Sequence, residues 1–328
     1  MKMPAESKVS YPARLWLLLS LMACLLAAPA VFAAPPPPLP EVPGYRALQM
    51  SLRTVNHLEA TVLVNGKPEQ FAVDTGASVT VMNEHDAMKD GATPTQSDSP
   101  YGQYSYTMGQ RLRIATAELS AGSMNFGRGP IALYSSGRSA PMFIERSAAS
   151  RQMSGLLGAD VLLHYKAIIN CRNRQIFFPV SGHGGSKLGS LVASMGFTRI
   201  PLREENGREL TVPCSLGGKT GRLLVDTGAF NSFLDGGFVA QLHLPTQRTE
   251  MSFGDFRGGH TQAGVTRVSD LQMDDYHLPA QKLFVLGNRL SGDASRVAET
   301  SIVGVLGVDL LTTQSGIIDL ESMSLFLK

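Results

Sequence analysis

The sequence predicts an all-β protein made of two similar lobes, and three observations support this fold class. Short apolar runs with alternating polarity, separated by Gly, Asn and Pro, are typical of strands rather than of long helices. Part of the first half of the chain returns in the second half, with Asp-Thr-Gly-Ala at the same place in both copies. The 328 residues are enough for two domains of ordinary size. We therefore expect one β topology to occur twice in a single chain.

The first 33 residues have the pattern of a secretory signal peptide. Three basic residues precede an apolar run from Leu15 to Ala33 that lacks charged side chains, and a signal peptidase would cut before Ala34. One alternative is an uncleaved membrane anchor, because the run approaches the length that spans a bilayer. Another is lipidation at Cys24, whose preceding residues resemble a bacterial lipobox. The expectation is an exported protein, periplasmic or secreted, without an integral membrane domain.

The rest of the chain divides at changes of composition. A Pro-rich linker is expected over residues 34–45, and a Gly/Ser-rich linker over residues 181–195. These place the N-terminal lobe at residues 46–180 and the C-terminal lobe at residues 196–328. Removal of the signal peptide takes away three basic residues and one acidic residue, which leaves the two signs equal in number. This balance does not suggest nucleic acid as a partner.

Two cysteines remain after the signal peptide, and their pairing is left open by the sequence. Cys171 and Cys214 lie in strand-like segments of different halves. An exported protein permits a disulfide, but two buried free thiols are the favoured interpretation.

The repeat extends well beyond the four-residue motif. Residues 61–77 align without a gap on residues 213–229, so that Asp74 and Asp226 are 152 positions apart. A second matching pair, Gly155–Leu163 and Gly304–Leu311, lies downstream at an offset of 149. A repeat of this length indicates two homologous halves rather than a chance recurrence.

Local patterns predict the elements within each half. Asn65-Gly66 and Gly217-Gly218 lie between apolar runs and predict tight hairpins. Each half is expected to close on a pair of short apolar strands, and helix is expected only in brief pieces, at residues 238–242 and 162–166. The repeated Asp160 and Asp309 follow a Gly at an expected helix start, so helix capping is their predicted role.

The two Asp-Thr-Gly motifs suggest a specific chemistry. Each Asp directly follows an apolar strand, which a simple turn preference for Asp and Gly does not explain. Peptide hydrolysis without a metal needs one carboxylate to take a proton from water and another to protonate the carbonyl oxygen. Asp74 and Asp226, brought together between the lobes, could share one proton for this purpose. Thr75 and Thr227 are candidates to brace the two loops, and Gly76 and Gly228 would permit close backbone approach.

This pattern resembles the retropepsin-like family of aspartic peptidases. The resemblance covers nearly all of residues 58–328 and includes Ala after each Gly, together with Leu156-Leu157-Gly158 and Val305-Leu306-Gly307 as supporting segments. It implies two retropepsin-like lobes in one chain, an intrachain pseudo-dimer with the active site between the lobes. The family's fold also implies a flap over each loop, at Tyr104–Arg111 and Phe253–Thr261, with Tyr106, Gly109, Gly258 and Gly259 as flap candidates.

One residue departs from the family pattern. The position after Ala is Ser78 in the first copy but Phe230 in the second, where a small polar residue is more usual. Phe230 therefore puts in doubt the symmetry of the site rather than the pair of aspartates.

Other catalytic classes lack their motifs. The seven histidines show no zinc-binding spacing, and neither a Gly-x-Ser-x-Gly elbow nor a phosphate-binding loop is present. We therefore expect no metal and no cofactor.

Two functional hypotheses remain open. The first is an aspartic endopeptidase that acts on a peptide or protein substrate as a monomeric pseudo-dimer. The second is a non-catalytic peptide-binding module of the cell envelope with the same fold. It is motivated by Phe230 and by the polar insertions at residues 135–152 and 288–300. A true homodimer, in which each half pairs with another chain, is a further possibility for the assembly.

Overall fold

The structure is a computed structural model, and it describes residues 41–52, 57–96, 98–99, 104–107, 110–135, 153–180, 187–205, 208–254, 260–287 and 301–328. The predicted signal peptide, with Cys24, lies outside these residues. Among the described residues, no helix combines the length and the apolarity needed to cross a bilayer.

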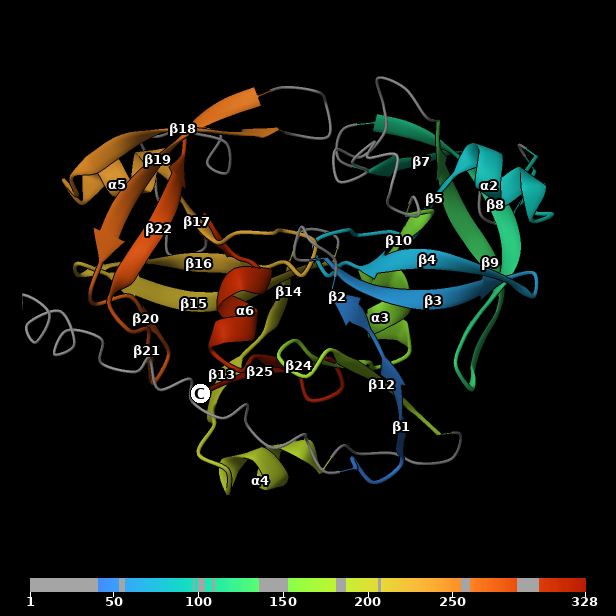
Figure 1. Cartoon of the computed structure of the whole chain (residues 1–328), viewed down its shortest axis with the longest axis horizontal. Helices are drawn as coiled ribbons and strands as arrows, with labels where there is room; N and C mark the ends of the chain where they lie inside the picture. Colours follow the sequence, from blue (N-terminus) through green and yellow to red (C-terminus); the bar gives the residue numbers. More distant parts are fainter. Residues whose placement is uncertain are drawn as a thin grey trace, which may run out of the picture. The chain divides into compact units, whose positions relative to one another are not determined.

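Strands form most of the regular structure, which confirms the predicted fold class (Figure 1). In the described part of the chain the helices are short, with six residues each. They are α2 (Glu84–Lys89), α3 (Ala159–His164), α4 (Leu188–Ala193), α5 (Gly236–Gln241) and α6 (Val308–Thr313).

A nine-stranded sheet forms the first half of the fold. Its strands are β2 (Ser51–Leu52), β3 (Leu58–Val64), β4 (Lys67–Val73), β5 (Val81–Asn83), β6 (Thr93–Pro94), β7 (Tyr104–Thr107), β8 (Gln110–Ala121), β9 (Met124–Tyr134) and β10 (Gly155–Leu157). Their order is β2-β3-β4-β10-β5-β9-β8-β6, and a further pairing of β3 with β8 curls the sheet back on itself. Strand β10 runs parallel to β4 and antiparallel to β5, so it is inserted between two strands that are near neighbours in the chain.

A ten-stranded sheet repeats this arrangement in the second half. Its strands are β14 (Arg203–Glu205), β15 (Glu209–Leu216), β16 (Lys219–Val225), β17 (Phe233–Asp235), β18 (Thr246–Gly254), β19 (His260–Val268), β20 (Gln272–Met273), β21 (Tyr276–His277), β22 (Gln281–Leu286) and β23 (Ile302–Leu306). Here β23 runs parallel to β16 and antiparallel to β17, as β10 does between β4 and β5. The repeat in sequence is therefore a repeat in topology.

A third sheet contains strands from both halves (Figure 1). Its strands, in their order across the sheet, are β1 (Tyr45–Gln49), β12 (Gln175–Pro179), β11 (Ile168–Asn170), β24 (Ile317–Asp319), β25 (Ser324–Leu327) and β13 (Thr198–Pro201). The predicted closing strand pairs exist in each half, and β11 joins β24 in antiparallel register with Ile169 opposite Ile318. Both isoleucines are fully buried in one apolar cluster that draws residues from the two halves.

The predicted hairpin turns are confirmed. Asn65 and Gly66 both have positive φ between β3 and β4, and Gly217 and Gly218 have positive φ between β15 and β16. This backbone geometry matches the right-handed twist of the flanking strands and favours Gly and Asn. Each turn sets the register of the strand that leads to an Asp-Thr-Gly motif.

The helices require two corrections to the sequence prediction. The pieces expected at residues 162–166 and 238–242 begin earlier, at Ala159 and Gly236. In addition, residues 188–193 of the predicted Gly/Ser-rich linker form helix α4, whose Leu188 and Val192 are buried in a core cluster. Residues 181–186 of that linker lie outside the described residues. Because apolar residues four positions apart share one helix face, this segment packs on the fold despite its small neighbours.

The two cysteines are buried free thiols. Burial raises the pKa of the Cys171 thiol to about 12, and the pKa of the Cys214 thiol to about 12 as well. These thiols therefore stay protonated and behave as small apolar side chains.

Truncation at the centre of the shared sheet is expected to destabilise the whole fold. Ile318→Ala removes a fully buried side chain that packs across the boundary between the halves. The free energy of unfolding should fall by about 2–5 kcal/mol in urea titrations. The control Met251→Ala, at a residue that is 50% exposed, should change it by less than about 0.5 kcal/mol. Equal effects of the two substitutions would contradict this account of the shared sheet.

Candidate functional site

Asp74 and Asp226 are placed by equivalent strand ends. Strand β4 ends at Val73 and strand β16 ends at Val225, and the next residue in each case is the aspartate. The backbone N–H of Asp74 donates to the carbonyl oxygen of Leu157 at 3.0 Å, and that of Asp226 donates to Leu306 at 3.1 Å. The inserted strands β10 and β23 therefore hold both motifs in the same way, and the predicted supporting Leu-Gly segments do lie beside them.

The structure brings the two carboxyl groups into hydrogen-bond contact with each other. Within each loop, two backbone N–H groups donate to one carboxylate oxygen. Gly76 and Ala77 donate to Oδ1 of Asp74 at 2.9 and 3.0 Å. Gly228 and Ala229 donate to Oδ1 of Asp226 at 2.8 and 3.2 Å. Each carboxyl group is thus fixed by its own loop and faces its counterpart.

Glycine is required at the third position of both motifs. A Cβ atom added to Gly76 would collide with the carboxyl group of Asp226, and one added to Gly228 would collide with that of Asp74. The predicted role of these glycines, to let backbone and side chain approach closely, is the role they have in the structure.

The two threonines bind the loops to each other across the boundary between the halves. The Thr75 hydroxyl donates to the carbonyl oxygen of Val225 at 2.7 Å, and it accepts the backbone N–H of Thr227 at 3.0 Å. The Thr227 hydroxyl donates to Val73 at 2.6 Å and accepts the N–H of Thr75 at 3.0 Å. Thr75 and Thr227 are 0% and 1% exposed, so these bonds form away from water. The structure therefore has the brace that the sequence suggested.

Burial makes both carboxyl groups harder to ionise. Asp74 is 3% exposed, and desolvation raises its pKa well above the ordinary range, with the charge of Asp226 as the next cause. Desolvation also raises the pKa of Asp226, while hydrogen bonds from Gly228 and from the carboxyl group of Asp74 oppose the rise. Two carboxyl groups in contact cannot both be charged at low cost. The pair therefore holds a proton at pH values where isolated aspartates have lost it.

A second pair of hydroxyl residues connects each loop to a helix. Thr80 donates to Oδ1 of Asp160 at 2.7 Å and accepts the N–H of Gly158 at 3.0 Å. In the second half, Ser232 donates to Asp309 at 2.6 Å and accepts the N–H of Gly307 at 2.8 Å. Sequence reasoning missed Thr80 and Ser232, although both lie six residues after their aspartate.

These bonds correct the role predicted for Asp160 and Asp309. The helices do begin where expected, but their N-cap residues are Gly158 and Gly307, with no capping bond from a side chain. The two aspartates lie in the first turn and bind the hydroxyl residues of the loops.

The residue after each Ala makes a contact with the opposite half. The ring of Phe230 packs edge-to-face on His57, with 4.3 Å between ring centroids and 78° between planes. At the equivalent place, the guanidinium of Arg208 donates to the carbonyl oxygen of Ser78 at 3.1 Å. Because His57 is 2% exposed, Phe230 contributes to a buried contact between the halves. The departure from symmetry thus has a structural role.

A hairpin is present at each predicted flap. Strand β7 pairs with β8 so that Thr107 lies opposite Gln110, and β18 pairs with β19 so that Gly254 lies opposite His260. Tyr106 lies on β7, but its side chain and Gly109 lie outside the described residues, as do Gly258 and Gly259. Most of the two polar insertions, residues 136–152 and 288–300, is also outside them.

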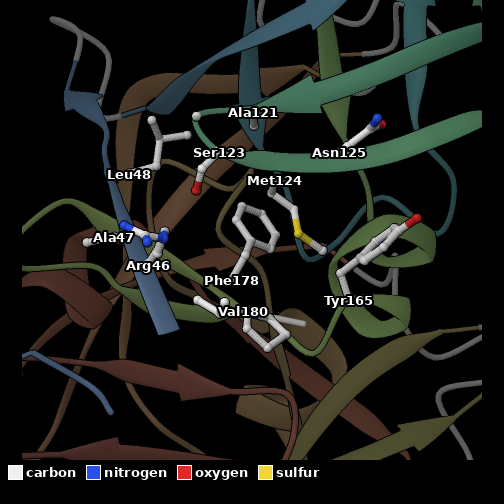
Figure 2. A pocket seen from close by; sticks show the side chains of 12 residues that line it. Arg46, Ala47, Leu48, Ala121, Ser123, Met124, Asn125, Tyr165, Phe178 and Val180 are labelled. Carbon is white, nitrogen blue, oxygen red and sulfur yellow. The ribbon is translucent and has the colours of Figure 1, made fainter. Parts of the chain in front are cut away.

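A cavity of about 400 Å³ lies in the first half, and neither aspartate lines it. Figure 2 shows its lining, in which Leu48 of β1, Met124 of β9, Phe178 of β12 and Tyr165 at the end of α3 surround the space. The cavity is therefore separate from the paired carboxyl groups.

Comparisons with known proteins agree with the two halves. A sequence profile of the aspartyl protease family matches residues 212–310, and a profile of gag-polyprotein aspartyl proteases matches residues 60–164. No curated protein matches the sequence significantly.

Solved structures of aspartic proteinase type are also similar to the chain. An aspartic proteinase from Irpex lacteus has 13% identity and a TM-score of 0.48, over 86% of this chain and 96% of its own. Basic 7S globulin from soybean has 11% identity and a TM-score of 0.49, over 88% and 95%.

Removal of one threonine hydroxyl should loosen the contact between the loops. Thr75→Ala leaves the carbonyl of Val225 and the N–H of Thr227 without that partner, each at a cost of about 1–3 kcal/mol. Thr75→Ser keeps the hydroxyl and should lose only about 1 kcal/mol. Urea unfolding of both variants measures the difference. If Ser and Ala were equally destabilising, the hydroxyl would not be the bracing group.

The paired carboxyl groups should also make stability depend on pH. Because the pKa of Asp74 is raised on folding, the native state holds a proton that the unfolded state releases above its ordinary pKa of about 3.9. Stability should therefore be highest at low pH and fall as the pH rises through the raised pKa of the folded pair. Asp74→Asn removes this titrating group, so its thermal midpoint should fall less between pH 4 and pH 7. Parallel curves for the two proteins would count against a shared buried proton.

Proposed function

We propose that this chain is an aspartic endopeptidase that hydrolyses peptide bonds with a water molecule activated by Asp74 and Asp226. The observation that carries the proposal is the contact between two buried carboxyl groups, each fixed by the N–H groups of its own loop. The profile matches to aspartyl proteases in both halves support the same reaction class. The tandem, retropepsin-like form, in which one chain supplies both halves of the site, is part of the proposal.

The reaction follows from the state of the pair. Asp74 has the more strongly raised pKa and donates its proton toward Asp226, so Asp226 is the base in the resting state. Asp226 takes a proton from water as the water oxygen attacks the carbonyl carbon of the substrate, and Asp74 gives its proton to the carbonyl oxygen. The tetrahedral product then collapses: the C–N bond breaks, a proton moves to nitrogen, and a carboxylic acid and an amine leave.

The surrounding contacts suit this chemistry because they fix the acid and the base before the substrate binds. The crossed Thr75 and Thr227 bonds and the glycines at positions 76 and 228 set the separation of the carboxyl groups. Preorganised geometry of this kind lowers the cost of reaching the transition state. The hairpins β7–β8 and β18–β19 are in a position along the chain to close over an extended substrate.

Further features of the proposal concern location and assembly. The apolar run at residues 15–33 supports export through a signal peptide, with an anchored form as the alternative. Because the two aspartates meet within one chain, a monomer carries both halves of the pair.

Replacement of either aspartate should abolish hydrolysis. Asp74→Asn and Asp226→Asn each remove one half of the acid–base pair while nearly keeping its shape, so kcat/KM on a peptide library should fall by at least about a thousandfold. Asp160→Asn, which lies at the helix behind the loop, is the matched control for loss of a carboxylate and should retain far more activity.

The same assay tests the alternative of a peptide-binding module. The contact of Phe230 with His57 shows an aromatic residue used for packing, which weakens the case that Phe230 blocks the site. Peptide binding without cleavage by the wild-type protein, at both acid and neutral pH, would favour the binding module. Full activity in either Asp→Asn variant would overturn the proposed mechanism.

A further inference from the structure

A second cavity of about 320 Å³ lies beside the loop that follows Asp74. Val79 lines it from the loop, Val161 from helix α3, and Phe126 from strand β9, and neither Asp74 nor Asp226 is among its lining residues. Its volume falls within the range of small-molecule sites in proteins. It is therefore a candidate binding site outside the paired carboxyl groups.

Two charged side chains that line this cavity also hold the loop. Arg208 donates from Nη1 to the carbonyl oxygen of Ser78 at 3.1 Å. Asp160 accepts the hydroxyl of Thr80 at 2.7 Å. Ser78 and Thr80 flank Val79, so three consecutive residues of the loop either line the cavity or are bound by side chains that do. A molecule in the cavity would thus be one contact away from the segment that carries Asp74.

The chemistry of the lining selects an apolar anion. Most of the wall is apolar, with Leu119, Phe126 and Val161 as its larger side chains. The Oδ1 atom of Asp160 is already bound by Thr80 and by the N–H of Val161. Arg208 carries five N–H donors, and its bond to Ser78 uses one nitrogen of the guanidinium. The planar guanidinium matches a carboxylate with two parallel hydrogen bonds.

We propose that this cavity binds a small apolar carboxylic acid, with the apolar group between Phe126 and Val161 and the carboxylate on Arg208. The bound molecule fixes Arg208 and Val79 and so raises kcat with little change in KM. This second effect rests on the proposed peptidase function. Two sources share the chemistry: the new C-terminal residue of a cleaved peptide, and a short fatty acid.

Binding is tested first, without reference to activity. The full-length protein is titrated by calorimetry with N-acetyl-leucine, N-acetyl-leucinamide and octanoate. The amide lacks the negative charge and should bind at least about tenfold more weakly than N-acetyl-leucine. Tighter binding of N-acetyl-leucine than of octanoate identifies a peptide terminus as the source, and the reverse order identifies a fatty acid. Equal binding of the acid and its amide would overturn the assignment of a carboxylate site.

Variants locate the binding site. Arg208→Gln should weaken N-acetyl-leucine binding by about tenfold or more. Arg203→Gln, at an exposed arginine of the preceding strand β14, should leave it unchanged. Gly129 also lines the cavity, and a Cβ added there meets no atom within 4 Å, so Gly129→Leu should reduce binding while the thermal midpoint stays near that of the wild type. Unaltered affinity in both Arg208→Gln and Gly129→Leu would place the ligand elsewhere and overturn the proposal.

Coupling to the loop is tested last, on cleavage of a peptide substrate. N-acetyl-leucine at saturation should raise kcat severalfold in the wild type and in Arg203→Gln, but not in Arg208→Gln. Binding without any change in kcat would overturn the coupling and keep the site. Absence of cleavage in every protein, with binding intact, would instead overturn the proposed peptidase function alone.

Discussion

The contact between two buried carboxyl groups is the constraint on which the rest of this structure depends. Like charges in a desolvated site repel strongly, so the pair forms only if one proton is retained or if other groups stabilise the charge. Here the N–H groups of Gly76 and Gly228 stabilise one oxygen of each carboxyl group. Burial, which would be costly for a lone carboxylate, thus becomes the cause of a shared proton.

Holding the two groups together requires two kinds of connection between the halves. Close to the site, the crossed threonine bonds fix the separation of the loops. Farther away, the pairing of β11 with β24 makes one sheet from strands of both halves. The contacts of Phe230 with His57 and of Arg208 with Ser78 lie at equivalent positions but use different chemistry. The duplicated architecture therefore keeps its geometry while single contacts diverge.

The sequence predicted the parts of the fold that depend on local pattern or on the repeat. The strands leading to Asp74 and Asp226 and the turn at Asn65-Gly66 follow from alternation, Gly content and self-similarity. Contacts between distant segments were harder to predict. The three-residue strands β11 and β24 are too short to indicate their partner, and the pairing depends on the docking of two complete halves.

Other misses have identifiable physical causes. Helix α4 was hidden because its small residues suggested a linker, although Leu188 and Val192 share one face. Thr80 and Ser232 had a weak signal in their equal spacing from the two aspartates, but their partners become apparent only in three dimensions. The opposite-half partner of Phe230 could not be found from sequence, because His57 lies far away in the chain.

The central claim is that Asp74 and Asp226 share one proton as a coupled pair, and carboxyl carbon-13 NMR tests it most directly. With ¹³C-labelled aspartate, the two resonances are assigned by comparison with Asp74→Asn and Asp226→Asn and followed from pH 2 to pH 9. We predict that both resonances move in the same two steps, with one step well above the ordinary range of an aspartate. Two independent single-step titrations, each near the ordinary pKa of about 3.9, would contradict the account.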